Sequence, residues 1–136
     1  MKKRLLQLKL NESNCIVIGS GILQALKIRN SKDIDIITSE NDYKRLKESK
    51  KFSVQINQYN KEILTDDHFE IGTNWEVLNK RYTFDDFKND SIVIDEVRYL
   101  SLDFLYRIKA NWIKEGKARP KDIIDIELIE NYYKTK

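Results

Sequence analysis

The sequence is poor in the residues that carry redox, disulfide and soft-metal chemistry. Its 136 residues include one cysteine, Cys15, and one histidine, His68. A single cysteine cannot form an intramolecular disulfide, and this pair of residues cannot supply a multi-cysteine or two-histidine metal site. We therefore expect any chemistry here to use mainly carboxylates, lysines, hydroxyls and backbone amides.

Proline, glycine and long apolar runs are also scarce. One proline and four glycines exclude collagen-like and linker-rich chains. No apolar run approaches the roughly 20 residues that span a membrane, and the basic start Met1–Arg4 precedes too short an apolar segment for a signal peptide. We therefore expect a cytoplasmic protein with no membrane contact. The net charge of +3 is close to neutral and does not predict nucleic-acid binding.

The length predicts one compact domain, with an α/β core at 1–100 and a C-terminal helical hairpin at 101–136. Ser101 is a good N-cap for the first hairpin helix, and Pro120 suits the first turn of the second, whose isoleucines predict a broad apolar face. The region 73–90 is expected to be rich in loops, with a helical turn at 84–87. Strands are expected at 15–18, 33–37, 52–57, 61–65, 68–72, 91–94 and 97–100, and further helices at 2–10, from Gly21 onward and at 40–51.

A glycine-rich turn, Gly19-Ser20-Gly21, follows the apolar run Cys15–Ile18. Glycines at a strand-to-helix turn let backbone amides approach a phosphate, but a tight turn favours glycine for its own geometry as well. The Walker loop is excluded because no Gly-Lys-Ser/Thr ending follows. The Rossmann fingerprint is excluded because Gln24 stands at the third glycine position.

Two acids lie one residue apart in Asp33-Ile34-Asp35, among aliphatic residues. Residues i and i+2 of a strand point to the same face, about 6 to 7 Å apart. Two carboxylates on a covered strand require a counter-charge, and hard oxygen ligands suit Mg²⁺. The simpler interpretation is a solvated strand face.

The two motifs together resemble the signature of the nucleotidyltransferase superfamily related to DNA polymerase beta. That signature is a hydrophobic strand, Gly-Ser, a spacer of about a dozen residues and two acids between aliphatics, which Gly19, Ser20, Asp33 and Asp35 match. The C-terminal part, from Leu100 to Ile126, is similar to the helical tail of small bacterial stand-alone members, including toxins of abortive-infection-type toxin–antitoxin pairs. The resemblance implies a mixed central β-sheet flanked by helices.

The resemblance also implies the roles of the site residues. Asp33, Asp35 and Glu70 would be catalytic and would bind one or two Mg²⁺ ions, with Glu70 standing where the family more often has Asp. Nucleotide-binding residues would be Gly19, Ser20, Gly21, Lys109 and Lys121. The activity would be transfer of a nucleoside monophosphate from an NTP to a hydroxyl of RNA, protein or a small molecule.

The alternative function is a catalytically inactive module that binds a nucleotide or a partner. A homo-oligomer or an antitoxin partner is compatible with either function. Asp122 and Asp125 are expected to be structural, with Asp125 forming an i,i+4 pair with Lys121. Trp75 and Trp112 are expected in the core or in a pocket wall.

Overall fold

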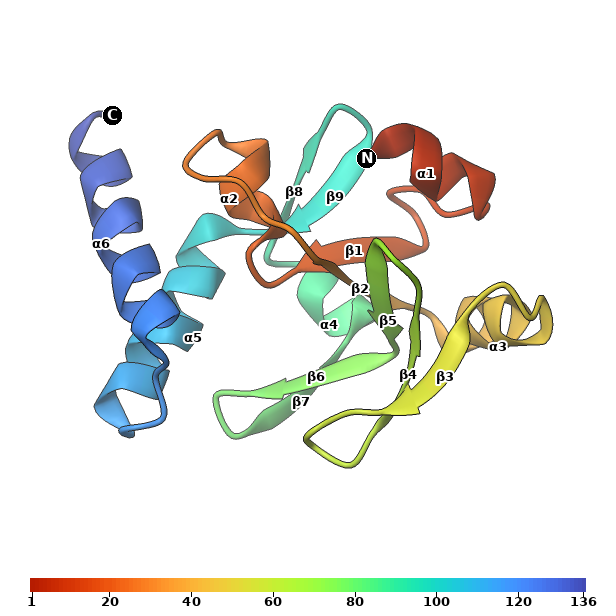
Figure 1. Cartoon of the computed structure of the whole chain (residues 1–136). Helices are drawn as coiled ribbons and strands as arrows, with labels where there is room; N and C mark the ends of the chain where they lie inside the picture. The colour runs from red at the N-terminus through yellow and green to blue at the C-terminus, as the bar shows by residue number, and fades with distance from the viewer.

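A computed structural model describes all 136 residues as a mixed α+β fold built on a seven-stranded sheet (Figure 1). The strand order is β3-β4-β5-β2-β1-β9-β8. β1 pairs antiparallel with β2 and parallel with β9, and β2 pairs parallel with β5, so the expected mixed sheet is confirmed. The strands are β1 (Cys15–Ile18), β2 (Ile34–Thr38), β3 (Ser53–Ile56), β4 (Glu62–Thr65), β5 (Phe69–Gly72), β8 (Ser91–Ile94) and β9 (Val97–Leu100).

Six helices accompany the sheet, and their ends follow local signals in the sequence. The Ser39 and Ser101 hydroxyls accept hydrogen bonds from the backbone amides of Asp42 and Phe104, so both act as N-caps. Pro120 opens the last helix, as predicted. No helix combines the length and apolarity that a membrane crossing requires. The helices are α1 (Lys2–Gln7), α2 (Gly21–Ala25), α3 (Glu40–Glu48), α4 (Phe84–Lys88), α5 (Leu102–Lys114) and α6 (Pro120–Lys134).

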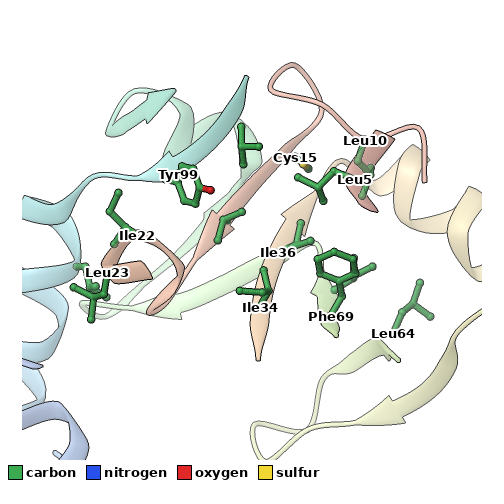
Figure 2. Packing of buried hydrophobic residues seen from close by; sticks show 14 of the residues in the cluster. Leu5, Leu10, Cys15, Ile22, Leu23, Ile34, Ile36, Leu64, Phe69 and Tyr99 are labelled. Atoms are coloured by element: carbon green, nitrogen blue, oxygen red, sulfur yellow. The ribbon is translucent and has the colours of Figure 1, made fainter. Parts of the chain in front are cut away.

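One face of the sheet is covered by the larger hydrophobic cluster (Figure 2). Cys15 and Val17 of β1 point into it beside Ile34 and Ile36 of β2. The Cys15 side chain is fully buried, and burial raises the pKa of its thiol to about 12. The cluster also takes in residues of α1, α2, α3, α5 and α6.

The opposite face carries a second cluster. Ile16 and Ile18 of β1 pack there with Phe87 of α4 and with Phe104 and Ile108 of α5. β1 is therefore buried on both faces, which explains why its sequence is a continuous apolar run rather than an alternating one. The odd-numbered residues of β2 from Asp35 onward share this second face.

The expectation of loops at 73–90 is wrong for its first half. Residues 74–83 form an antiparallel hairpin of β6 (Asn74–Val77) and β7 (Lys80–Thr83), followed by α4. The turn residues Leu78 and Asn79 both adopt left-handed conformations, with φ of 54° and 60°. Two left-handed residues form the turn that suits a two-residue hairpin. Such turns are usually Asn-Gly or Gly-Gly, and Leu-Asn lacks this signal because Leu does not favour the left-handed conformation.

Further boundaries differ from the expectation: the helix expected at 40–51 ends at Glu48. α1 ends at Gln7 rather than Leu10, and Asp33 lies just before β2.

The broad apolar face predicted for α6 is also wrong: Ile129 is buried, but Ile123 and Ile124 are 47% and 55% exposed. α6 lies beside α5 at the edge of the molecule (Figure 1), so it buries only one narrow side.

The close packing of α2 on β1 can be tested at Gly21. A Cβ at this position would lie 2.2 Å from Cγ1 of Val17, which real side chains do not tolerate. We predict that Gly21→Ala lowers the free energy of unfolding by about 1 to 3 kcal/mol in urea denaturation. The double variant Val17→Ala/Gly21→Ala should show a Gly21→Ala cost smaller than in the wild-type background. Equal costs in the two backgrounds would contradict this steric explanation.

Candidate active site

Two carboxylates lie side by side at the centre of the sheet. Asp35 of β2 and Glu70 of β5 are partners in the parallel register, and both are half-buried. The residues that flank Glu70, Phe69 and Ile71, are buried on the opposite face. Neither carboxylate forms a salt bridge, whereas ten other ion pairs are present in the molecule. This pair therefore has no cation of its own.

Burial and the neighbouring carboxylates shift the pKa of Asp35. Burial, the neighbouring charges of Glu70 and Asp33, and a hydrogen bond with Glu70 raise the pKa of Asp35 from 3.8 to about 7. The positive charge of Lys121 opposes the shift, which places this exposed lysine near the pair. A cation at this position would therefore be strongly favoured electrostatically.

The glycine turn lies directly against this pair. Gly19 has a left-handed φ of 63°, and a Cβ on it would be 3.0 Å from Oδ2 of Asp35. The Ser20 hydroxyl is 2.7 Å from the Ser31 hydroxyl, which ties the turn to the loop before β2. Gly21 is buried, and a side chain at this position would collide with Val17. Packing therefore explains why this residue is glycine, and no ligand is needed to explain it.

Asp33 does not complete a three-carboxylate centre. Its side chain is exposed in the loop before β2. No group of three or more His, Cys, Asp or Glu side chains is arranged to hold a metal ion. Of the three acids predicted for metal binding, the fold thus brings together Asp35 and Glu70.

Asp35 and Glu70 line a cleft of about 1050 Å³ on the second face of the sheet. Its walls come from the β6–β7 hairpin, the turn between β3 and β4, and the connection between α5 and α6. Apart from the pair, the lining combines aromatic, cationic and carboxamide side chains. Among them are Tyr59, Trp75, Trp112, Lys117 and Arg119. The pocket-wall prediction for both tryptophans is confirmed.

Lys109 has a different place from the one expected. Its ammonium is buried, 2.6 Å from Oδ1 of Asp122 and 3.0 Å from Oδ2 of Asp125. A contact with a triphosphate would require it to abandon both carboxylates. Lys109 is therefore a structural residue here, and the structural role expected for the two aspartates is confirmed.

Two arginines extend this ion pair into a buried charge network. Arg29 donates two hydrogen bonds to Asp125, at 2.6 and 2.8 Å, in place of the predicted Lys121 contact. Arg119 donates to Asp122 through its side chain and its backbone amide. Burial alone would raise the pKa of Asp122, but hydrogen bonds from Arg119 and Lys109 outweigh it and lower the pKa to about 2. This stabilisation is present above pH 3.8 and is lost as the pH falls toward 2.

Sequence reasoning predicted a core or pocket-wall position for the two tryptophans but missed the hairpin that carries one of them. The β6–β7 hairpin that carries Trp75 was expected to be loop, and no sequence pattern indicated that Arg119 lines a cleft. The available signal was the alternation of Trp75 and Val77 with polar residues, which is typical of a strand with one buried face.

Comparisons of the chain with protein-family models, with curated proteins and with solved structures found no match.

The raised pKa of Asp35 predicts a specific dependence of stability on pH. Between about pH 4 and pH 7 the unfolded chain ionises this group while the folded chain keeps it protonated, so the free energy of unfolding falls as the pH rises. We expect Asp35→Asn to gain at least about 1 kcal/mol on the wild type between pH 5 and pH 8 in chemical denaturation. The exposed Asp67→Asn variant is the control. Parallel pH profiles for Asp35→Asn and wild type would disprove the shift.

Removal of the central lysine should unbalance the buried network. Lys109→Met would leave Asp122 and Asp125 buried without their shared ammonium, so we predict a loss of about 3 to 5 kcal/mol in urea denaturation. Lys114→Met, an exposed lysine on the same helix, should change stability by less than about 0.5 kcal/mol. Similar losses of stability in the two variants would mean that the buried charge network does not hold α5 and α6 together.

Proposed function

We propose that the protein is a Mg²⁺-dependent nucleotidyltransferase that transfers a nucleoside monophosphate from an NTP to a hydroxyl acceptor. The observation that supports this most directly is the adjacent pair Asp35 and Glu70, which has no protein cation and lies against the Gly19 turn in a large cleft. The resemblance of Gly19-Ser20 and Asp33-Ile34-Asp35 to the superfamily signature supports the same activity.

The donor set fits magnesium. Mg²⁺ binds through one or two protein carboxylates together with substrate phosphates and water, and it does not require a closed cage of protein ligands. Asp35 and Glu70 would hold it, and their mutual repulsion would be relieved on binding. When bound, the ion would neutralise charge on the phosphate oxygens of the substrate.

The remaining chemistry is assigned to residues of the chain. The acceptor hydroxyl oxygen forms a bond to the α-phosphorus, and the bond from that phosphorus to the bridging oxygen breaks, so that pyrophosphate leaves with the bonding electrons. Glu70 takes the hydroxyl proton as general base. The lack of a side chain at Gly19 lets the backbone of this turn approach the Asp35 carboxylate closely, and Lys121 adds positive charge near that carboxylate.

A second candidate is a catalytically inactive module that binds a nucleotide or a partner on the same scaffold. It is favoured by the placement of Asp33, which stays outside the carboxylate pair, and by the absence of a preformed three-ligand group. Both candidates require the same cleft, and they differ in whether phosphoryl transfer follows binding.

The proposal predicts that both paired carboxylates are required for transfer. With Mg²⁺ and an α-labelled NTP, we expect the wild type to incorporate label into an RNA, protein or small-hydroxyl fraction and to release pyrophosphate. Asp35→Asn and Glu70→Gln should each lower this rate by at least about 100-fold. Glu76→Gln is the matched control, because Glu76 lines the same cleft but is already paired with Lys61 and Arg81.

Isothermal titration with Mg²⁺ and NTP separates the two candidates. Binding that Asp35→Asn abolishes, without transfer by the wild type to any fraction, would favour the inactive module. Equal binding by wild type and Asp35→Asn, with no transfer by either, would contradict both functions for this site.

A further inference from the structure

Both tryptophans of the chain lie in the cleft that holds the carboxylate pair. Trp75 comes from β6 and Trp112 from α5, and both are half-buried. Their ring centroids are 6.1 Å apart and their planes meet at 71°. Two nearly perpendicular indoles thus form an aromatic corner in the cleft wall, which we call the indole corner.

The indole corner is held in place from behind. Trp75 contacts the buried Phe87 ring at 6.3 Å, and the buried Lys109 ammonium lies 5.9 Å from the centre of the Trp112 ring. Lys109 is itself fixed by two aspartates. The corner is therefore a preorganised surface, and a ligand that binds there would lose little free energy to side-chain ordering.

Two carboxamide side chains line the same cleft as the tryptophans. Asn74 precedes Trp75, and its side-chain oxygen accepts a hydrogen bond from Lys61. Asn111 precedes Trp112 and donates through its side-chain nitrogen to Glu115, which leaves its Oδ1 without a hydrogen-bond partner. Both asparagines line the cleft. The cleft therefore offers the carboxamide oxygen of Asn111 as a hydrogen-bond acceptor in addition to its aromatic surface.

We propose that the indole corner binds the nucleobase of the donor NTP, with the triphosphate directed toward Asp35, Glu70 and the Gly19 turn. This inference rests on the proposed function and adds the half of the nucleotide site that the carboxylates do not explain. An aromatic surface recognises the base rather than the phosphates, and stacking of a base on an aromatic side chain is worth about 1 to 3 kcal/mol. The cleft volume of about 1050 Å³ is at the upper end of small-ligand sites, which leaves space for an acceptor as well.

Intrinsic fluorescence tests this directly, because the chain has two tryptophans and both line the cleft. We expect the tryptophan emission of the full chain to change saturably on titration with Mg²⁺ and NTP. Titration with Mg²⁺ and inorganic tripolyphosphate, which has no base, should leave the emission unchanged. A change of equal size with tripolyphosphate would overturn the proposal.

Substitutions at the corner supply the second measurement. Trp112→Leu should weaken NTP binding at least about fivefold by calorimetry and leave tripolyphosphate binding unchanged. Trp112→Phe keeps an aromatic ring and should bind NTP within about threefold of the wild type. The wild-type fluorescence titration decides the matter even if Trp112→Leu does not fold, which its thermal unfolding curve would show.

The outcomes separate this inference from the proposed function. Calorimetric NTP binding without a fluorescence change, or with full affinity in a folded Trp112→Leu variant, would overturn the nucleobase subsite and leave the transferase proposal standing. Absence of any NTP binding by the wild type would overturn both.

Discussion

The buried charge network is the constraint on which the arrangement of the molecule depends. It joins Arg29, in the loop after α2, to Asp125 of α6, 96 residues along the chain, and Lys109 lies between Asp125 and Asp122. Buried charges are costly unless every one is paired, so Lys109 fixes α6 against α5 and the Arg29 contact favours docking of this helical hairpin on the loop after α2. The same docking sets the distance between the α5–α6 wall of the cleft and the sheet that forms its floor.

The cleft divides its tasks between rigid and variable parts of the fold. Its floor, with Asp35 and Glu70, belongs to adjacent central strands, whose pairing fixes the two carboxylates with little freedom. Its walls come from the β6–β7 hairpin, the β3–β4 turn and the α5–α6 connection. Turns and connecting segments of this kind tolerate sequence change most readily. Under the proposed function, substitution in the walls would alter the molecule that is accepted without disturbing the carboxylate pair at the floor.

The sequence predicted the features that depend on neighbouring residues. The buried strand at Cys15–Ile18, the cap at Ser101 and the acid at Glu70 between two buried residues all follow from local pattern. Prediction from the sequence failed for features that depend on contacts between residues distant in the chain. Lys109 was predicted to bind the nucleotide, because the two aspartates that pair with it lie on another helix and no local pattern reveals them.

The dependence on distant contacts also explains why the β6–β7 hairpin was not predicted. The turn at Leu78 and Asn79 lacks the glycine that is typical of a hairpin, and its conformation is imposed by pairing and by burial of Val77.

The fully buried Cys15 has a practical consequence. Its thiol is neutral and shielded, so the natural chain should behave toward thiol reagents as a cysteine-free background. A single cysteine placed at the exposed tip of the β6–β7 hairpin would then be the only residue to take a spectroscopic label. Motion of that cleft wall could be followed in otherwise unmodified protein.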